Sequence, residues 1–169
     1  MIKAIVRLIH PLGSNIKRSQ IAAGFAWGLL LGLIPAGNFF WIVLLLISFF
    51  FNHNHATKIL FMVLLMLFAP VIRPLVDLVG WQVLHIGALQ PFFTTMYNMP
   101  FVPFTKFNNT LVAGGLVGGV ILWLPVFFLI MALIPLYRNK VAPKIRNSKI
   151  VKTIRKLPFF SLIDKAING

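Results

Sequence analysis

Apolar residues fill most of the chain in long runs, which predict helices rather than strands. The first four runs cover residues 20–34, 39–51, 59–72 and 75–89. At ~1.5 Å per residue, a helix over one of these runs is about 20 to 23 Å long, whereas the hydrocarbon core of a bilayer is about 30 Å thick. None of the four runs is therefore long enough to cross a membrane comfortably alone.

Prolines interrupt the runs at residues 35–38, Pro-Ala-Gly-Asn, and at residues 70–74, Pro-Val-Ile-Arg-Pro. Irregular backbone at membrane depth persists only where protein buries it or where it lines a wet cavity. We therefore predict broken or re-entrant helix pairs. In the simplest arrangement the first pair enters and returns, and the second pair forms one long broken crossing.

The fifth run, residues 110–137, is long enough to cross a membrane by itself. Trp123 and Tyr137 are candidate interfacial anchors, and Pro125 is a candidate kink. The fold class predicted from these runs is an all-α integral membrane protein with one clear C-terminal transmembrane helix.

Composition strengthens the membrane interpretation and excludes much chemistry. The 169 residues are 59% hydrophobic and 11% charged, with a mean hydropathy of +0.92. Asp77 and Asp164 are the two acidic residues, and there is no cysteine. Paired-carboxylate catalysis, thiol nucleophiles and cysteine-ligated metals are therefore excluded. We predict no catalytic residue, no metal and no cofactor, so the chain is expected not to be an enzyme.

The basic residues concentrate at the two ends of the chain. Of sixteen Lys and Arg, four lie in residues 1–18 and nine in residues 138–169. The positive-inside rule then places both termini in the cytoplasm and residues 90–109 outside. We accordingly divide the chain into a basic amphipathic N-terminal arm (1–18), retained rather than cleaved as a signal peptide, a membrane domain (19–137) and a basic amphipathic cytoplasmic tail (138–169).

The basic tail has two possible partners. Its apolar residues share one helical face while its basic residues occupy the others, which is typical of a helix lying on an anionic membrane surface. The same charges could bind nucleic acid, but a chain this apolar favours the membrane. We therefore expect no nucleic-acid partner.

Glycines at regular spacing predict two faces of close helix contact. Gly24, Gly28 and Gly32 are spaced by four, and Gly114 and Gly118 repeat this spacing in the last run. Such faces let two helix backbones approach closely. The contact could be helix packing within the chain or an interface with a partner subunit.

Two charges stand in or beside the second break. Arg73 and Asp77 lie four residues apart, and a charge at membrane depth is costly unless it is paired or wet. A structural ion pair is the economical interpretation, and a substrate or lipid-headgroup site is the alternative. The ligand-binding residues predicted from both breaks are Pro35, Gly37, Asn38, Arg73 and Asp77.

The sequence Asn52-His53-Asn54-His55 superficially suggests a metal site. Two histidines at i and i+2 diverge on a helix, and no carboxylate stands nearby in the sequence. A short polar turn between apolar segments is the better interpretation. Similarly, His85 could share a helical face with Asp77, but a lone interfacial histidine is usually packed or solvated.

Residues 21–38, IAAGFAWGLLLGLIPAGN, resemble the signature of a bacterial membrane family catalogued as domain of unknown function twenty sixty-two. The pattern combines an Ile-Ala pair, spaced glycines, a proline and a second apolar run that ends on an asparagine, here Asn52 or Asn54. The resemblance covers about residues 15–135. Where family members usually show Asn-Pro, this chain has Ala69-Pro70, which leaves the local role of Pro70 open.

One branch of that family is especially similar. It occurs in bacteria with two membranes, beside the gene for a very large periplasmic protein. The resemblance therefore implies a multi-pass inner-membrane partner of an envelope protein of the bridge-like lipid-transfer type. It implies no catalytic residue.

The leading hypothesis is a non-enzymatic inner-membrane subunit of an envelope-spanning complex. It would assist phospholipid transfer towards the outer membrane through a large bridge-like periplasmic partner that carries a membrane anchor. The alternative is a self-contained transporter of a small solute or an ion, in which the helix breaks would coordinate the substrate. An integral membrane enzyme ranks third.

Overall fold

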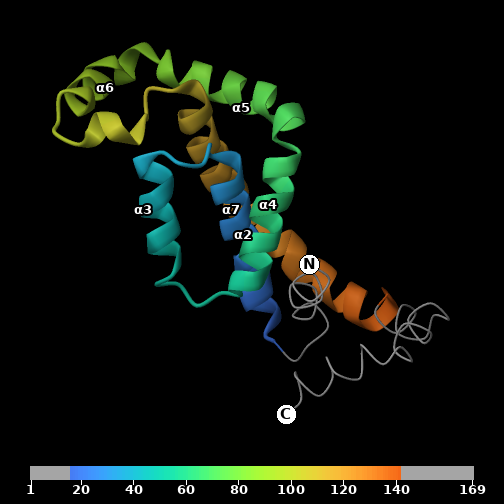
Figure 1. Cartoon of the computed structure of the whole chain (residues 1–169). Helices are drawn as coiled ribbons and strands as arrows, with labels where there is room; N and C mark the ends of the chain where they lie inside the picture. The colour runs from blue at the N-terminus through green and yellow to red at the C-terminus, as the bar shows by residue number, and fades with distance from the viewer. Residues whose placement is uncertain (1–15, 142–169) are drawn as a thin grey trace.

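A computed structural model describes residues 16–141 of the chain, and Figure 1 shows its course. Within these residues all regular structure is helical, which confirms the predicted all-α class. The basic arm and tail predicted at the two ends lie almost wholly outside the described residues. The principal helices are α2 (Arg18–Leu33), α3 (Phe39–Ser48), α4 (His55–Leu67), α5 (Ala69–Leu84), α6 (Gln90–Tyr97) and α7 (Thr110–Leu136).

Helix α2 is the centre of the fold, with α4 packed on one side and α7 on the other (Figure 1). Most of α2 is buried, as expected for a helix that is apolar all round. Its core cluster consists of Trp27, Leu30 and Ile34, joined by Val112 of α7. These contacts fix the positions of α2 and α7 relative to each other.

The glycine faces lie at the contacts between these helices. A Cβ built on Gly28 would come within 2.7 Å of the Lys58 carbonyl oxygen, and one on Gly32 within 2.9 Å of Leu65 Cβ. Gly24 is similarly close to Thr57 and Asn54. The face formed by Gly24, Gly28 and Gly32 is thus occupied by α4 and its N-cap within the same chain.

The two predicted glycines of α7 differ in their surroundings. Gly114 lies against the backbone of Val76 and Gly80 in α5. One turn further along the helix, a Cβ built on Gly118 would meet no atom within 4 Å. The two residues of this predicted face therefore differ: Gly114 carries the crossing of α5 and α7, and Gly118 does not.

Helix α3 is the least packed of the long helices. It makes few contacts with α2 and with the short 3-10 helix Val102–Thr105, and Figure 1 shows it standing apart from the α2–α4–α7 core. Several of its large apolar side chains are exposed, including Phe39, Leu46 and Ile47. A hydrogen bond from Trp41 Nε1 to the Leu31 carbonyl oxygen, 2.9 Å long, ties it to α2.

The second break differs from the sequence prediction in position. The chain bends by 88° between α4 and α5, at Phe68, rather than over residues 70–74. Pro70 lies in the first turn of α5, where a missing backbone N–H costs nothing, and Pro74 lies inside the helix. An angle this large is compatible with a broken span or a re-entrant loop, the two arrangements predicted for the apolar pairs.

Residues 90–109, expected to form an interfacial loop, contain more structure than that. They include α6 and the 3-10 helix Val102–Thr105. Asn109 then caps α7, since its side-chain oxygen accepts hydrogen bonds from the backbone N–H groups of Leu111 and Val112.

One helical segment, Thr110–Lys140, is long and apolar enough to cross a membrane, with a mean hydropathy of 2.6. Only 11% of its most apolar stretch is buried within the described chain. The segment therefore presents an apolar surface that needs an apolar environment.

Candidate functional site: a cavity at the two helix breaks

Three residues, Ile34, Gly37 and Asn38, determine the backbone conformation at the first break. Ile34, before Pro35, has the extended backbone that proline imposes on its predecessor. Gly37 has a φ of +89°, in the region that favours glycine. Asn38 caps α3, because its Oδ1 accepts from the Trp41 N–H at 2.7 Å while its Nδ2 donates to the Pro35 carbonyl at 2.7 Å.

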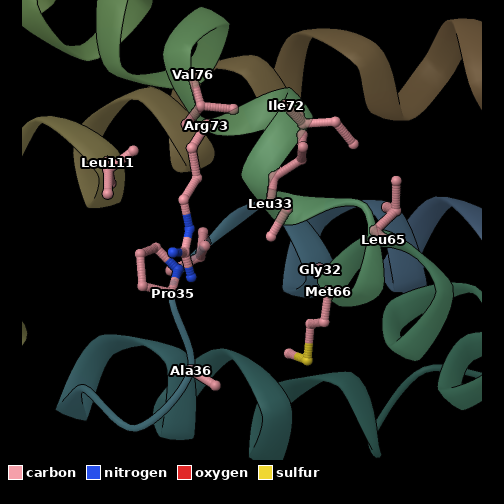
Figure 2. A pocket seen from close by; sticks show the side chains of 12 residues that line it. Gly32, Leu33, Pro35, Ala36, Leu65, Met66, Ile72, Arg73, Val76 and Leu111 are labelled. Carbon is pink, nitrogen blue, oxygen red and sulfur yellow. The ribbon is translucent and has the colours of Figure 1, made fainter.

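The first break and the α4–α5 bend together enclose a cavity of about 310 Å³. Figure 2 shows it between the end of α2, the end of α4 and the start of α5, with Leu111 of α7 at one side. Two residues predicted from separate breaks, Pro35 and Arg73, line this one cavity. The structure therefore brings the two breaks into a single site.

Arg73 is the one charged residue in the cavity lining. Its side chain runs from α5 towards Pro35 (Figure 2), and the rest of the wall consists of glycine, proline and apolar side chains. Because Arg73 is also exposed, the cavity communicates with the outside of the molecule. A cationic group above an apolar hollow suits an amphipathic anion.

The predicted ion pair between Arg73 and Asp77 is wrong. Thr110 Oγ1, at the start of α7, donates a hydrogen bond to Asp77 Oδ1. Helical spacing of four allowed a contact with Arg73, but α7 supplies a hydroxyl on the other side and Arg73 extends into the cavity. Asp77 therefore contacts the start of α7, whereas Arg73 lines the cavity.

The remaining predicted ligand residues do not line the cavity. Gly37 and Asn38 shape the loop beside it, and Asp77 faces the start of α7. His85 is stacked on Trp81, with ring centroids 4.3 Å apart, and its Nδ1 lies 2.7 Å from the Trp81 carbonyl oxygen. Of the predicted set, Pro35 and Arg73 are the ones that a ligand in this cavity could touch.

A polar cluster that the sequence did not reveal lies at the opposite end of α4. Lys58 is 1% exposed, and its Nζ donates a hydrogen bond to Ser48 Oγ at 2.7 Å. The same Nζ lies 4.0 Å from the centre of the Phe49 ring, a cation–π contact. The end of α3 thus covers a buried charge in the first turns of α4.

His53 belongs to the same cluster, in the loop between α3 and α4. It is buried and stacks on Trp27, and neither ring nitrogen has a hydrogen-bond partner among residues 16–141. Burial, followed by the nearby charges of Lys58 and His55, lowers the pKa of His53 to about 4. His53 is therefore neutral at physiological pH.

The metal interpretation of residues 52–55 gains no support from this geometry. The rings of His53 and His55 are in contact, with centroids 4.5 Å apart, but within residues 16–141 no group of three metal-ligating side chains exists. Asn54 instead caps α4 by accepting from the Thr57 N–H at 2.9 Å, and Asn52 accepts from Gln20 Nε2 at 3.0 Å. The segment is the polar turn that the sequence predicted.

A comparison with known proteins places the chain in a family. It is 32% identical over 158 residues to an uncharacterized protein of Treponema pallidum (strain Nichols), and the match covers 94% of this chain and 98% of the relative. The chain belongs to the family of this Treponema protein. That relative has no described activity that could be transferred to this chain.

Two other comparisons gave no match. No family model matches the chain, so the resemblance to domain of unknown function twenty sixty-two stays a prediction. No solved structure matches it either. The function must therefore be inferred from the site itself.

A second hollow, almost wholly apolar, lies on the other side of the core. It measures about 360 Å³ and is enclosed by Phe40 of α3, α6 and the first turns of α7. Its lining has no charged residue, so it lacks the feature that distinguishes the Arg73 cavity.

Proposed function

We propose that this chain is a non-enzymatic inner-membrane subunit that binds phospholipid and assists its transfer towards the outer membrane. The observation that carries the proposal is the cavity of about 310 Å³ in which Arg73 is the single charge in an otherwise apolar wall. A guanidinium pairs well with a phosphate, and acyl chains need apolar surface. A phospholipid has both chemistries in one molecule.

The surroundings of the cavity support the same ligand. Exposed apolar side chains continue from its rim along α4 and α5, among them Leu67, Phe68 and Val71. These side chains offer a path for acyl chains while the headgroup meets Arg73. A small polar solute would gain nothing from this apolar path.

The proposed topology is multi-pass with both termini in the cytoplasm. It is supported by the apolar segment Thr110–Lys140 and by the basic residues at the two ends of the chain. In this orientation the Arg73 cavity, which lies beside the start of α7, faces the outer half of the membrane. That is the half from which lipid would leave for a periplasmic protein.

The proposed partner is a large bridge-like periplasmic protein with a membrane anchor. Its docking surface would be the segment from α6 to the start of α7, on the same side as the cavity. This segment exposes the aromatic residues Phe92, Tyr97, Phe101 and Phe104, and exposed aromatic patches mark interaction surfaces. The choice of a bridge-like periplasmic protein as the partner comes from the family resemblance of residues 21–38.

A crosslinking experiment tests lipid binding directly. A photoreactive amino acid replaces Ile72, whose side chain lines the cavity, and the full-length chain is irradiated in native membranes, purified in mild detergent and analysed by mass spectrometry. We expect a covalently attached phospholipid, and we expect Arg73→Gln to reduce the yield several-fold. Lys17→Gln is the matched control, because Lys17 is exposed and does not line the cavity.

The same purification tests the complex. We expect a large envelope protein to co-purify with the chain. A chain that purifies alone, carries no lipid and moves an ion or a small solute in proteoliposomes would replace this proposal with the transporter hypothesis.

A further inference from the structure

The helices beside the Arg73 cavity are too short for an undisturbed bilayer. Helix α3 has 10 residues and α4 has 13. At ~1.5 Å per residue they measure roughly 15 and 20 Å, against a hydrocarbon core of about 30 Å. The 88° bend at the end of α4 prevents α5 from extending α4 in a straight line.

Helices α3 and α4 each present an apolar side suited to contact with lipid. Within residues 16–141, α7 packs on α2 and α5, and large apolar side chains of α3 and α4 are left exposed. This exposed belt ends at Phe50, 90% exposed, in the loop after α3, and at Leu67, 72% exposed, at the end of α4. Lipid against a short apolar belt must thin locally to match it.

Two cations stand at the two ends of α4. Lys58 lies in its first turns, and Arg73 lies just beyond the bend that ends it. Asp77, the acid within the described residues, is engaged by Thr110 and neutralises neither of them. The guanidinium of Arg73 is therefore available to a phosphate in the structure as it stands. The ammonium group of Lys58 becomes available when the end of α3 moves away.

Helix α3 is suited to such a movement. Phe40, Trp41 and Leu44 pack against the core cluster. Hydrogen bonds Trp41–Leu31 and Lys58–Ser48 hold the helix near its two ends. Beside it, Gly37 has a positive φ, and a Cβ built there would meet no described atom within 4 Å, so the loop that carries α3 is loosely packed at this point.

From these observations we infer that the chain is a phospholipid scramblase, in which the thinned bilayer along α3 and α4 lets headgroups pass between the leaflets by way of Lys58 and Arg73. The inference rests on the proposed function, since it takes phospholipid as the ligand and a membrane as the environment. It adds an activity of the chain by itself: downhill equilibration of the leaflets, which consumes no energy source. This activity would deliver lipid from the inner leaflet to the Arg73 cavity.

Reconstitution of the purified full-length chain tests the activity. Vesicles contain a trace of tail-labelled fluorescent phosphatidylglycerol, and dithionite is added outside, where it reduces only the probe of the outer leaflet. We expect vesicles with the chain to lose nearly all fluorescence, whereas empty vesicles keep the inner-leaflet share. Back-extraction of the probe by albumin distinguishes lipid movement from dithionite leakage.

Variants and bilayer thickness test the mechanism. Arg73→Gln and Lys58→Met should each slow scrambling several-fold, and Lys17→Gln, at an exposed position away from both cations, should not. Size-exclusion chromatography and thermal unfolding show whether each variant is folded. The proposed path requires a locally thin bilayer along α3 and α4. Scrambling by the unmodified chain should therefore fall steeply as the acyl chains of the vesicle lipids are lengthened.

The outcomes separate the two proposals. Vesicles with the folded chain that scramble no faster than empty ones, while crosslinking at residue 72 still captures phospholipid, would overturn the scramblase and leave lipid binding intact. Scrambling that is independent of chain length and of Arg73 would overturn the proposed path. Loss of both scrambling and crosslinking would overturn the proposed function as well.

Discussion

Lys58 and Ser48 join α4 to the end of α3 through a buried hydrogen bond of 2.7 Å between Nζ and Oγ. Ser48 is fully buried, and its hydroxyl in turn donates a hydrogen bond to the Leu45 carbonyl oxygen at 2.6 Å. A lysine at this depth costs free energy unless its charge is compensated. Its contacts here are one hydroxyl and the ring of Phe49.

Ser48→Ala should therefore destabilise the protein by about 1 to 3 kcal/mol, because it removes an acceptor from a buried ammonium group. Lys58→Met keeps the length of the side chain and removes the charge, so its cost should be smaller. In the Lys58→Met background, Ser48→Ala should cost almost nothing. Thermal unfolding in detergent measures all three, and equal costs of Ser48→Ala in both backgrounds would contradict the interaction.

The pKa of His53, lowered to about 4 chiefly by burial, predicts a pH dependence of stability. In the unfolded chain this imidazole titrates near its ordinary value of 6.5, so between pH 6.5 and 4 the unfolded state binds a proton that the folded state does not. Stability should be independent of this group above pH 6.5, fall as the pH drops towards 4, and change no further below that value.

His53→Phe provides the comparison for this pH dependence, because phenylalanine can still stack on Trp27 but cannot be protonated. Melting temperatures measured between pH 4 and pH 7 should fall less steeply in the variant than in the unmodified protein. Identical slopes would show that His53 is not the group responsible.

Glycine substitutions should separate packed from open positions. Gly28→Ala places a Cβ within 2.7 Å of the Lys58 carbonyl oxygen, a backbone atom that cannot rotate away, and should cost about 1 to 3 kcal/mol. Gly118 also lies inside a helix, but a Cβ built there would meet no described atom within 4 Å. Gly118→Ala should therefore leave the melting temperature unchanged. If Gly118→Ala disrupts instead an assembly with a second protein, that position is an intermolecular contact.

Local signals in the sequence predicted much of the fold. The run at residues 110–137 corresponds closely to α7, Thr110–Leu136, and the run at residues 20–34 to α2, Arg18–Leu33. These boundaries are set by proline and by asparagine caps, which act within a few residues. The second break lies earlier than predicted because Pro70, which suggests a helix end, stands in the first turn of α5, where a helix accommodates proline.

The site was harder to predict because its parts come from distant segments. Arg73 and Asp77 seemed to be partners at helical spacing, but Thr110, 33 residues after Asp77, provides the hydrogen bond. The sequence analysis makes no prediction for Lys58, since burial of a lysine depends on α3 folding over it. One available signal was its position three and seven residues before Phe61 and Leu65, on the helical face that meets the glycines of α2.

The proposed topology predicts opposite accessibility for two exposed loops. The chain has no cysteine, so single substitutions at Phe50, after α3, and at Asn98, after α6, give unique labelling sites. A membrane-impermeant maleimide should label position 98 in intact spheroplasts and position 50 only after lysis. Labelling of position 50 in intact spheroplasts, with position 98 protected, would invert the orientation.

The last prediction concerns the partner of Asp77. Thr110→Val removes the hydroxyl that donates to the carboxylate, so it should cost about 1 kcal/mol, and far less when Asp77→Asn is already present. Arg73→Gln and Asp77→Asn should instead be additive to within about 0.5 kcal/mol, because no ion pair joins them. Thermal unfolding of the single and double variants in detergent measures both cycles. A strong coupling between residues 73 and 77, with none between 77 and 110, would restore the ion pair and remove Arg73 from the proposed lipid site.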